Sequence, residues 1–125
     1  MYNSDWNAAI FAAAGLERLK IKPDGAFSLD WMIPAPAQGV VTISTLAEST
    51  DILEICKELN DEETAMLAKV ERDFLNILEG GCTAPIGALA FVKEDEVCFK
   101  GVLLNADGTK RIDVTSKEKI GRHNY

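Results

Sequence analysis

Hydrophobic positions change their spacing several times along the chain, and each spacing predicts a different element. Residues 5–20 hold a small-residue apolar run and then a short amphipathic stretch. This pattern fits either a buried strand followed by a helix or one continuous alanine-rich helix. Residues 22–25 predict a turn, because Pro23 presets its backbone angle and Gly25 tolerates positive φ.

The next segment cannot be a helix, because Pro34 and Pro36 each remove a backbone donor and restrict the residue before them. We therefore expect a shaped loop over residues 33–39. Residues 40–45 are β-branched at nearly every position, which predicts a strand buried on both faces.

From residue 50 the apolar spacing becomes helical. A first amphipathic helix is predicted to stop near Asn60, where Asn60 and Glu63 predict a capping box that begins a longer helix. The apolar stripe of the longer helix runs up to Gly80, a residue suited to ending it. The neighbouring Glu71 and Arg72 are expected to form an exposed, solvated pair on this helix, unless Arg72 turns toward the cysteine-containing loop that follows the helix.

Strand-like patterns follow over residues 86–92, 97–104 and 110–114, separated by short polar turns. They predict an antiparallel meander of three strands, and residues 117–122 are expected to begin a further helix that the chain end cuts off. The fold class is therefore α+β, with a three-stranded antiparallel sheet packed against helices.

Composition narrows the function classes. Across 125 residues, 47% are hydrophobic and the net charge is -7, which fits a globular protein and disfavours nucleic acid or an anionic membrane as partner. The longest apolar run, residues 8–16, is too short to span a bilayer. Three cysteines without CxxC spacing and a single histidine predict neither a disulfide framework nor a metal site, so a reducing cytoplasm is the expected location.

One of the cysteines stands out by its surroundings. Cys82 follows Gly80 and Gly81 in the segment LEGGCTAPIG, which predicts a mobile, accessible thiol. Taken alone, such a loop cysteine is more often a small apolar residue than a functional group. Cys56 and Cys98 fall in apolar patterns and are expected in the core, and His123 lies too near the chain end for a catalytic base.

Three blocks in order give Cys82 a sharper interpretation. AAAGLERL at 12–19, IPAPAQG at 33–39 and NDEETAMLAKVERDFLNILEGGCTAPIGALA at 60–90 resemble hydroxymethylbilane synthase, also called porphobilinogen deaminase. The GVLLNADGTK segment at 101–110 continues the similarity. The chain thus resembles the C-terminal portion of that family.

The resemblance implies a transferase that extends a dipyrromethane cofactor with four porphobilinogen units, in tetrapyrrole biosynthesis. The cysteine matching Cys82 carries that cofactor through a thioether, and Gly81 belongs to its hinge. The family's catalytic aspartate and most of its basic substrate cradle lie in N-terminal regions without a match here. We therefore expect no catalytic residue in this fragment and no deaminase activity from it alone.

The resemblance also assigns the parts. Residues 1–59 correspond to the remnant of the second domain and a segment returning to the first, and residues 60–125 to the C-terminal cofactor-carrying domain with a truncated last helix. Gln38 and Gly39 match a loop that lines the cofactor cleft. Leu46 departs from the family, which commonly has an arginine there for a cofactor carboxylate, so that role is not carried over.

Two further expectations remain. A small α+β interaction or redox-sensing module, with Cys82 as an exposed thiol, is the alternative to an enzyme fragment. In the isolated chain, residues 8–16 and 40–45 would lack partners and leave apolar surface exposed, so the fragment is expected to pack on itself or self-associate.

Overall fold

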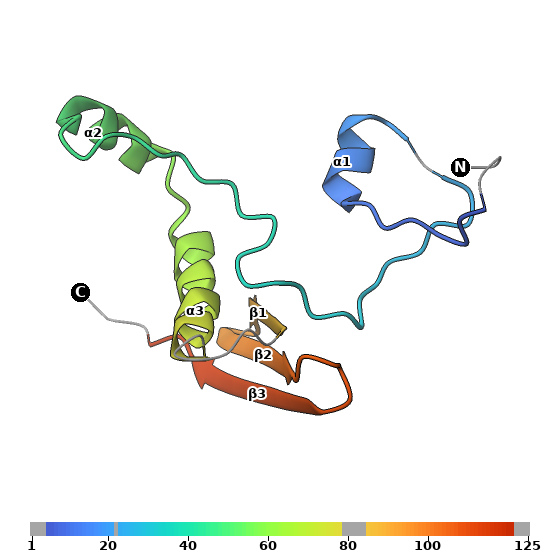
Figure 1. Cartoon of the computed structure of the whole chain (residues 1–125). Helices are drawn as coiled ribbons and strands as arrows, with labels where there is room; N and C mark the ends of the chain where they lie inside the picture. The colour runs from blue at the N-terminus through green and yellow to red at the C-terminus, as the bar shows by residue number, and fades with distance from the viewer. Residues whose placement is uncertain (1–4, 22, 79–84, 122–125) are drawn as a thin grey trace. The chain divides into compact units, whose positions relative to one another are not determined.

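The chain forms two compact units. The computed structural model describes residues 5–21, 23–78 and 85–121, and the units are Met1–Asp30 and Trp31–Tyr125. Within these described ranges, the first unit contains one short helix, and the second contains two helices and a three-stranded sheet (Figure 1). The division expected after residue 59 stays a prediction.

The first unit holds α1 (Ala13–Arg18) and the turn that follows it. Residues 8–12 form neither strand nor helix, so the continuous helix and the strand followed by a helix are both wrong in their first half. A strand needs a partner, and the described part of the first unit supplies none for this apolar run. Alanine content alone does not extend the helix backward. The turn is confirmed, because the Ala26 N–H donates to the Pro23 carbonyl at 3.3 Å and Gly25 has a φ of 75°.

The second unit begins with an irregular segment and two helices, α2 (Thr50–Glu58) and α3 (Glu62–Leu78). Both helices were predicted, but the capping residue of α3 was wrong. Asp61, not Asn60, accepts the Thr64 N–H through Oδ1 at 2.7 Å. This hydrogen bond is the first cause of a pKa for Asp61 below its ordinary value. Gly80, the expected end of the helix, lies outside the described residues.

The sheet is an antiparallel meander in the order β1 (Ile86–Lys93), β2 (Glu96–Leu104) and β3 (Arg111–Lys119). Glu94 and Asp95 both have positive φ, which suits the tight turn that pairs Lys93 with Glu96. The α+β class with three antiparallel strands is therefore confirmed.

Two strand predictions were wrong. Residues 40–45 form no strand and are largely exposed, because a strand requires a ladder partner and the described residues supply none for them. Residues 117–119 continue β3 instead of starting a helix, since their backbone pairs with β2 as far as Glu96 opposite Lys119. Residues 122–125 lie outside the described part.

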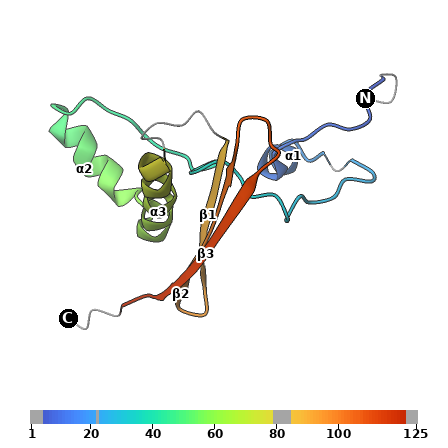
Figure 2. The same ribbon diagram turned by 60° about the horizontal axis from the view of Figure 1, so that its bottom comes forward.

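The core lies between α3 and the first two strands. Figure 2 shows α3 against one face of the sheet, which is seen there nearly edge on. Phe74 of α3 meets Phe99 of β2 edge to face, with ring centroids 5.0 Å apart. Gly101 leaves room for this ring, because a Cβ there would lie 2.7 Å from Phe74 Cζ. Buried core residues and the helix residues packed on them are Ala88, Ala90, Phe99, Leu67, Val70 and Phe74.

Candidate functional site

The predicted site residues fall into two groups. Cys82 and Gly81 lie in residues 79–84, outside the described part of the chain. Gln38 and Gly39 are described, and they end the proline-containing loop over residues 33–39 in the second unit. The described part of the candidate site therefore consists of that loop and the elements it contacts.

Two successive turns shape the loop. In the first, the Gln38 N–H donates to the Ala35 carbonyl at 3.1 Å, with Pro36 and Ala37 at the corner. Ala37 has a φ of 57°, a conformation that usually requires glycine. In the second, the Val40 N–H donates to the Ala37 carbonyl at 3.3 Å. The predicted shaped loop is confirmed, and its corner residue is held in an unfavourable backbone conformation.

The two residues predicted to face a cofactor are both exposed, and each has a donor without an acceptor in the described part of the chain. The side-chain Oε1 of Gln38 accepts the Ala35 N–H at 3.2 Å, so its amide NH₂ is directed away from that bond. Gly39 has a φ of 86° and open space where a Cβ would stand. Neither the Gln38 NH₂ nor the Gly39 N–H has an acceptor among the described residues. These donors suit a carboxylate ligand.

The beginning of the loop lies along the free edge of β1. The Ala88 N–H donates to the Pro34 carbonyl at 2.9 Å, although Pro34 itself has no donor to give back. Gly87 permits this approach, because a Cβ there would lie 3.0 Å from the Ile33 carbonyl oxygen and 3.1 Å from that of Pro34. The loop therefore covers an edge that would otherwise present unpaired backbone groups.

Glu71 joins the loop to the sheet. Its Oε2 accepts the Ala37 N–H at 2.6 Å and its Oε1 accepts the Ala90 N–H at 2.7 Å. The side chain is only 7% exposed, and it is the one buried charged residue in the described part of the chain. Hydrogen bonds from backbone N–H groups satisfy both carboxylate oxygens, which a buried charge requires.

The expected exposed pair of Glu71 and Arg72 is therefore wrong. Arg72 is exposed, and the structure records no ion pair for it among the described residues, whereas Glu71 points inward. The signal was present in the sequence. Glu71 stands four residues after Leu67 and three before Phe74, so it occupies a position on the core-facing stripe of α3.

The other candidate groups do not form a second site. Cys98 is buried in β2 as predicted, whereas Cys56 of α2 is only partly buried, and both are free thiols. No three His, Cys, Asp or Glu side chains gather as a metal site within the described ranges. None of the helices in those ranges has the length and apolarity needed to cross a membrane. His123 lies outside them.

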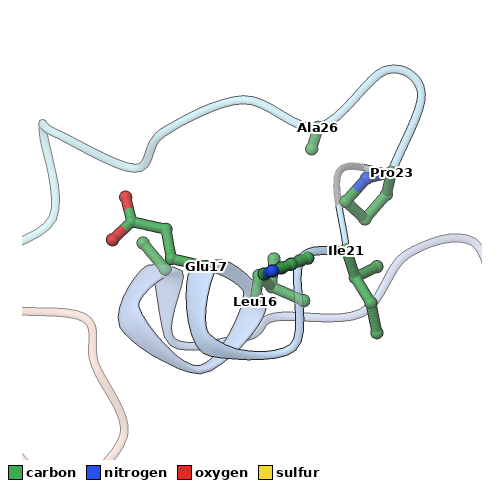
Figure 3. A pocket seen from close by; sticks show the side chains of 7 residues that line it. Leu16, Glu17, Ile21, Pro23 and Ala26 are labelled. Carbon is green, nitrogen blue, oxygen red and sulfur yellow. The ribbon is translucent and has the colours of Figure 1, made fainter.

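A hollow of about 430 Å³ lies beside α1 in the first unit. Leu16, Ile21, Pro23 and Ala26 contribute mainly apolar lining, and Figure 3 shows the Glu17 carboxylate directed away from Ile21 and Pro23. Neither Gln38 nor Gly39 lines it. The hollow therefore adds no chemistry to the candidate site.

Comparison with known proteins identifies the family of this chain. Residues 65–123 match the family model described as "Porphobilinogen deaminase, C-terminal domain". Residues 1–54 match the model described as "Porphobilinogen deaminase, dipyromethane cofactor binding domain". The chain belongs to the porphobilinogen deaminase family.

Individual relatives agree. The chain is 40% identical over 112 residues to the porphobilinogen deaminase of Campylobacter jejuni strain 81-176, covering 86% of the chain and 36% of the relative. It is 40% identical to that of Campylobacter concisus, covering 93% and 40%, and 33% identical to that of Clostridium novyi, covering 92% and 42%. The chain thus spans about two fifths of the length of these curated relatives.

Proposed function

We propose that this chain is the cofactor-anchoring part of a porphobilinogen deaminase, the transferase that joins four porphobilinogen units into hydroxymethylbilane. One observation carries the proposal furthest. The hydrogen bond between Ala37 and Glu71 joins the segment that matches the cofactor-binding model to the segment that matches the C-terminal model. The two matched regions therefore meet at the loop that bears Gln38 and Gly39.

Cys82 is the proposed anchor. Its thiolate would form a sulfur–carbon bond to the aminomethyl carbon of a pyrrole as the carbon–nitrogen bond breaks, and the thiol proton leaves with the amine as ammonia. Gly81, directly before it, would allow the anchored group to move. When bound, the dipyrromethane supplies the primer on which porphobilinogen units are added.

The loop residues fit a ligand that carries carboxylates. Each pyrrole of the proposed cofactor bears an acetate and a propionate, and the Gln38 NH₂ and Gly39 N–H are donors without an acceptor in the described part of the chain. We propose that these two groups bind a cofactor carboxylate. Leu46, where the family commonly has an arginine, is 66% exposed and offers no charge for that task.

Catalysis requires groups from beyond the matched portion. With a net charge of -7, the chain lacks the excess of arginine and lysine that a polypyrrole with many carboxylates needs. We therefore propose that the chain by itself anchors the cofactor but does not turn over porphobilinogen. Its own residues hold and orient, while the proton donor to the leaving amine comes from the remaining part of the family's protein.

Two proposals concern its surroundings. We place the protein in a reducing cytoplasm, supported by the free thiols of Cys56 and Cys98. We also propose that the isolated chain self-associates, because residues such as Val41 and Ile43 expose large apolar side chains.

The test combines mass and turnover. In a protein that joins this chain to the rest of the family's domains, intact-mass measurement should show a dipyrromethane adduct that Cys82→Ala abolishes and the matched control Cys56→Ala retains. The chain alone, incubated with porphobilinogen, should release no ammonia catalytically. An unmodified yet active joined protein would defeat the anchor and favour an interaction or redox-sensing module, and turnover by the chain alone would defeat the division of labour.

A further inference from the structure

We infer that Glu71 is a positioning residue, which holds the loop of Gln38 and Gly39 in its ligand-binding shape by clamping it to the sheet. The inference rests on the proposed function for what the loop binds, but the clamp itself rests on geometry alone. The side chain of Glu71 connects three elements, namely its own helix α3, strand β1 and the loop over residues 33–39.

The two carboxylate oxygens of Glu71 bind different elements. Oε1 accepts the N–H of Ala90, a core residue of β1, so this oxygen is fixed to a rigid part of the unit. Oε2 accepts the N–H of Ala37 at 2.6 Å, so the second oxygen holds the loop at a fixed position relative to β1. Both bonds are made to backbone groups, and they therefore set the course of the main chain and do not depend on the neighbouring side chains.

The second step is the strain at the loop corner. Ala37 has a φ of 57°, and a residue with a Cβ adopts this region only when its surroundings hold it there. Its N–H is the group that Glu71 binds, and Gln38 and Gly39 follow directly. Loss of the clamp should therefore let Ala37 relax to negative φ and move the two proposed ligand-binding groups.

The third step excludes a direct chemical role. Glu71 is 7% exposed and each of its oxygens already accepts a backbone hydrogen bond. Its carboxylate is therefore shielded from solvent and directed at backbone groups, not toward a ligand. Its influence on a ligand has to pass through the loop.

Hydrogen exchange of single backbone amides tests the clamp in the chain itself, without any cofactor. Glu71→Gln keeps the length of the side chain but leaves one acceptor for two donors, so exchange of the Ala37 amide should accelerate about tenfold. Amides of the β2 and β3 pairing should be unchanged. Glu63→Gln makes the same change at an exposed position of α3 and should alter neither set.

A second substitution tests whether the clamp acts on the strained corner. Adding Ala37→Gly to Glu71→Gln removes the penalty for positive φ and should restore the wild-type chemical shifts of the Gln38 and Gly39 amides. If Glu71→Gln fails to fold, replacement of residue 37 by lactic acid deletes only its N–H and should produce the same shift changes. Unchanged Ala37 exchange, or equal acceleration throughout the sheet, would overturn the inference.

The functional arm uses the joined protein described above. Glu71→Gln should slow formation of the Cys82 adduct about tenfold while leaving its final mass unchanged, and Ala37→Gly should restore the rate. An unchanged rate alongside a loosened loop would overturn the positioning role. Absence of any adduct in the unsubstituted protein would instead defeat the proposed function, and the exchange results would still decide the clamp.

Discussion

At Gly87 the missing side chain lets the backbone of the loop approach β1. A Cβ at this position would lie 2.8 Å from Val102 Cγ1 and within 3.1 Å of the carbonyl oxygens of Ile33 and Pro34. Two of these three neighbours are backbone atoms, which cannot shift easily to make room for a Cβ. Gly87→Ala should therefore lower the free energy of unfolding by about 1–3 kcal/mol, measured by urea denaturation.

Gly121 provides the matched control for this substitution. A Cβ there meets nothing within 4 Å among the described residues, and Gly121 does not have a positive φ. Gly121→Ala should leave the free energy of unfolding within about 0.5 kcal/mol of that of the unsubstituted chain. An equal loss of stability in both variants would show that the close approach of the loop does not require glycine at position 87.

Single residues also show where sequence reasoning reached its limit. The loop over residues 33–39 was predicted because proline acts locally, on its own backbone and on the residue before it. The role of Glu71 was missed, because its partners Ala37 and Ala90 lie 34 and 19 positions away along the chain. Helical spacing placed Glu71 on the apolar stripe, but spacing alone does not name the donors that make its burial tolerable.

The start of α3 gives a prediction about pH. Hydrogen bonds from Thr64 hold the pKa of Asp61 below its ordinary value of 3.8. A carboxyl group with a lowered folded-state pKa stabilises the folded state fully above its unfolded pKa, and this contribution is lost as pH falls through the folded pKa. The thermal unfolding midpoint of the chain, followed by helical circular dichroism, should therefore fall as pH drops below 3.8.

Asp61→Asn isolates this effect. Asparagine also caps helices but does not titrate in this range, so the variant should show a smaller loss of thermal midpoint on acidification. Asp107 and Asp113, whose pKa values are lowered by Thr109 and Arg111 respectively, titrate in both proteins and cancel in the comparison. Identical acid profiles for the two proteins would remove Asp61 as the source.

Elements were predictable where their signal is local. The two helices of the second unit and the first two strands follow from apolar spacing and short turns, and their observed bounds lie close to the predicted ones. Residues 40–45 and the end of β3 were mispredicted because strand formation depends on a partner. Residues 117–119 found one in β2, whereas residues 40–45 have none among the described residues.

For the whole molecule, family membership was predictable and the complete site was not. The ordered blocks lie within or across the segments that the two family models match, residues 1–54 and 65–123. Cys82 and Gly81, the proposed anchor and its hinge, lie outside the described residues, so their geometry stays a prediction. The structure adds how the loop over residues 33–39 is supported, through hydrogen bonds of Glu71 and Pro34.

Exposed apolar surface leads to the last prediction, which concerns association of whole chains. Val41 is 84% exposed and Ile43 61% exposed, in a segment with strand-forming composition and no ladder partner in the described part of the chain. Such a segment tends to pair with a second copy. Sedimentation velocity of the isolated chain should therefore show a weight-average mass that rises with protein concentration.

The segment itself can be tested by adding charge at adjacent positions. Val41→Lys removes an exposed apolar side chain and should shift the association to higher protein concentration. Thr42→Lys adds the same charge to a neighbouring exposed polar residue and should shift it less. Because the chain carries a net charge of -7, lysine at either position reduces the overall repulsion between copies. A weaker association in Val41→Lys therefore reflects lost apolar contact, and equal behaviour of the two variants would assign the association to another surface.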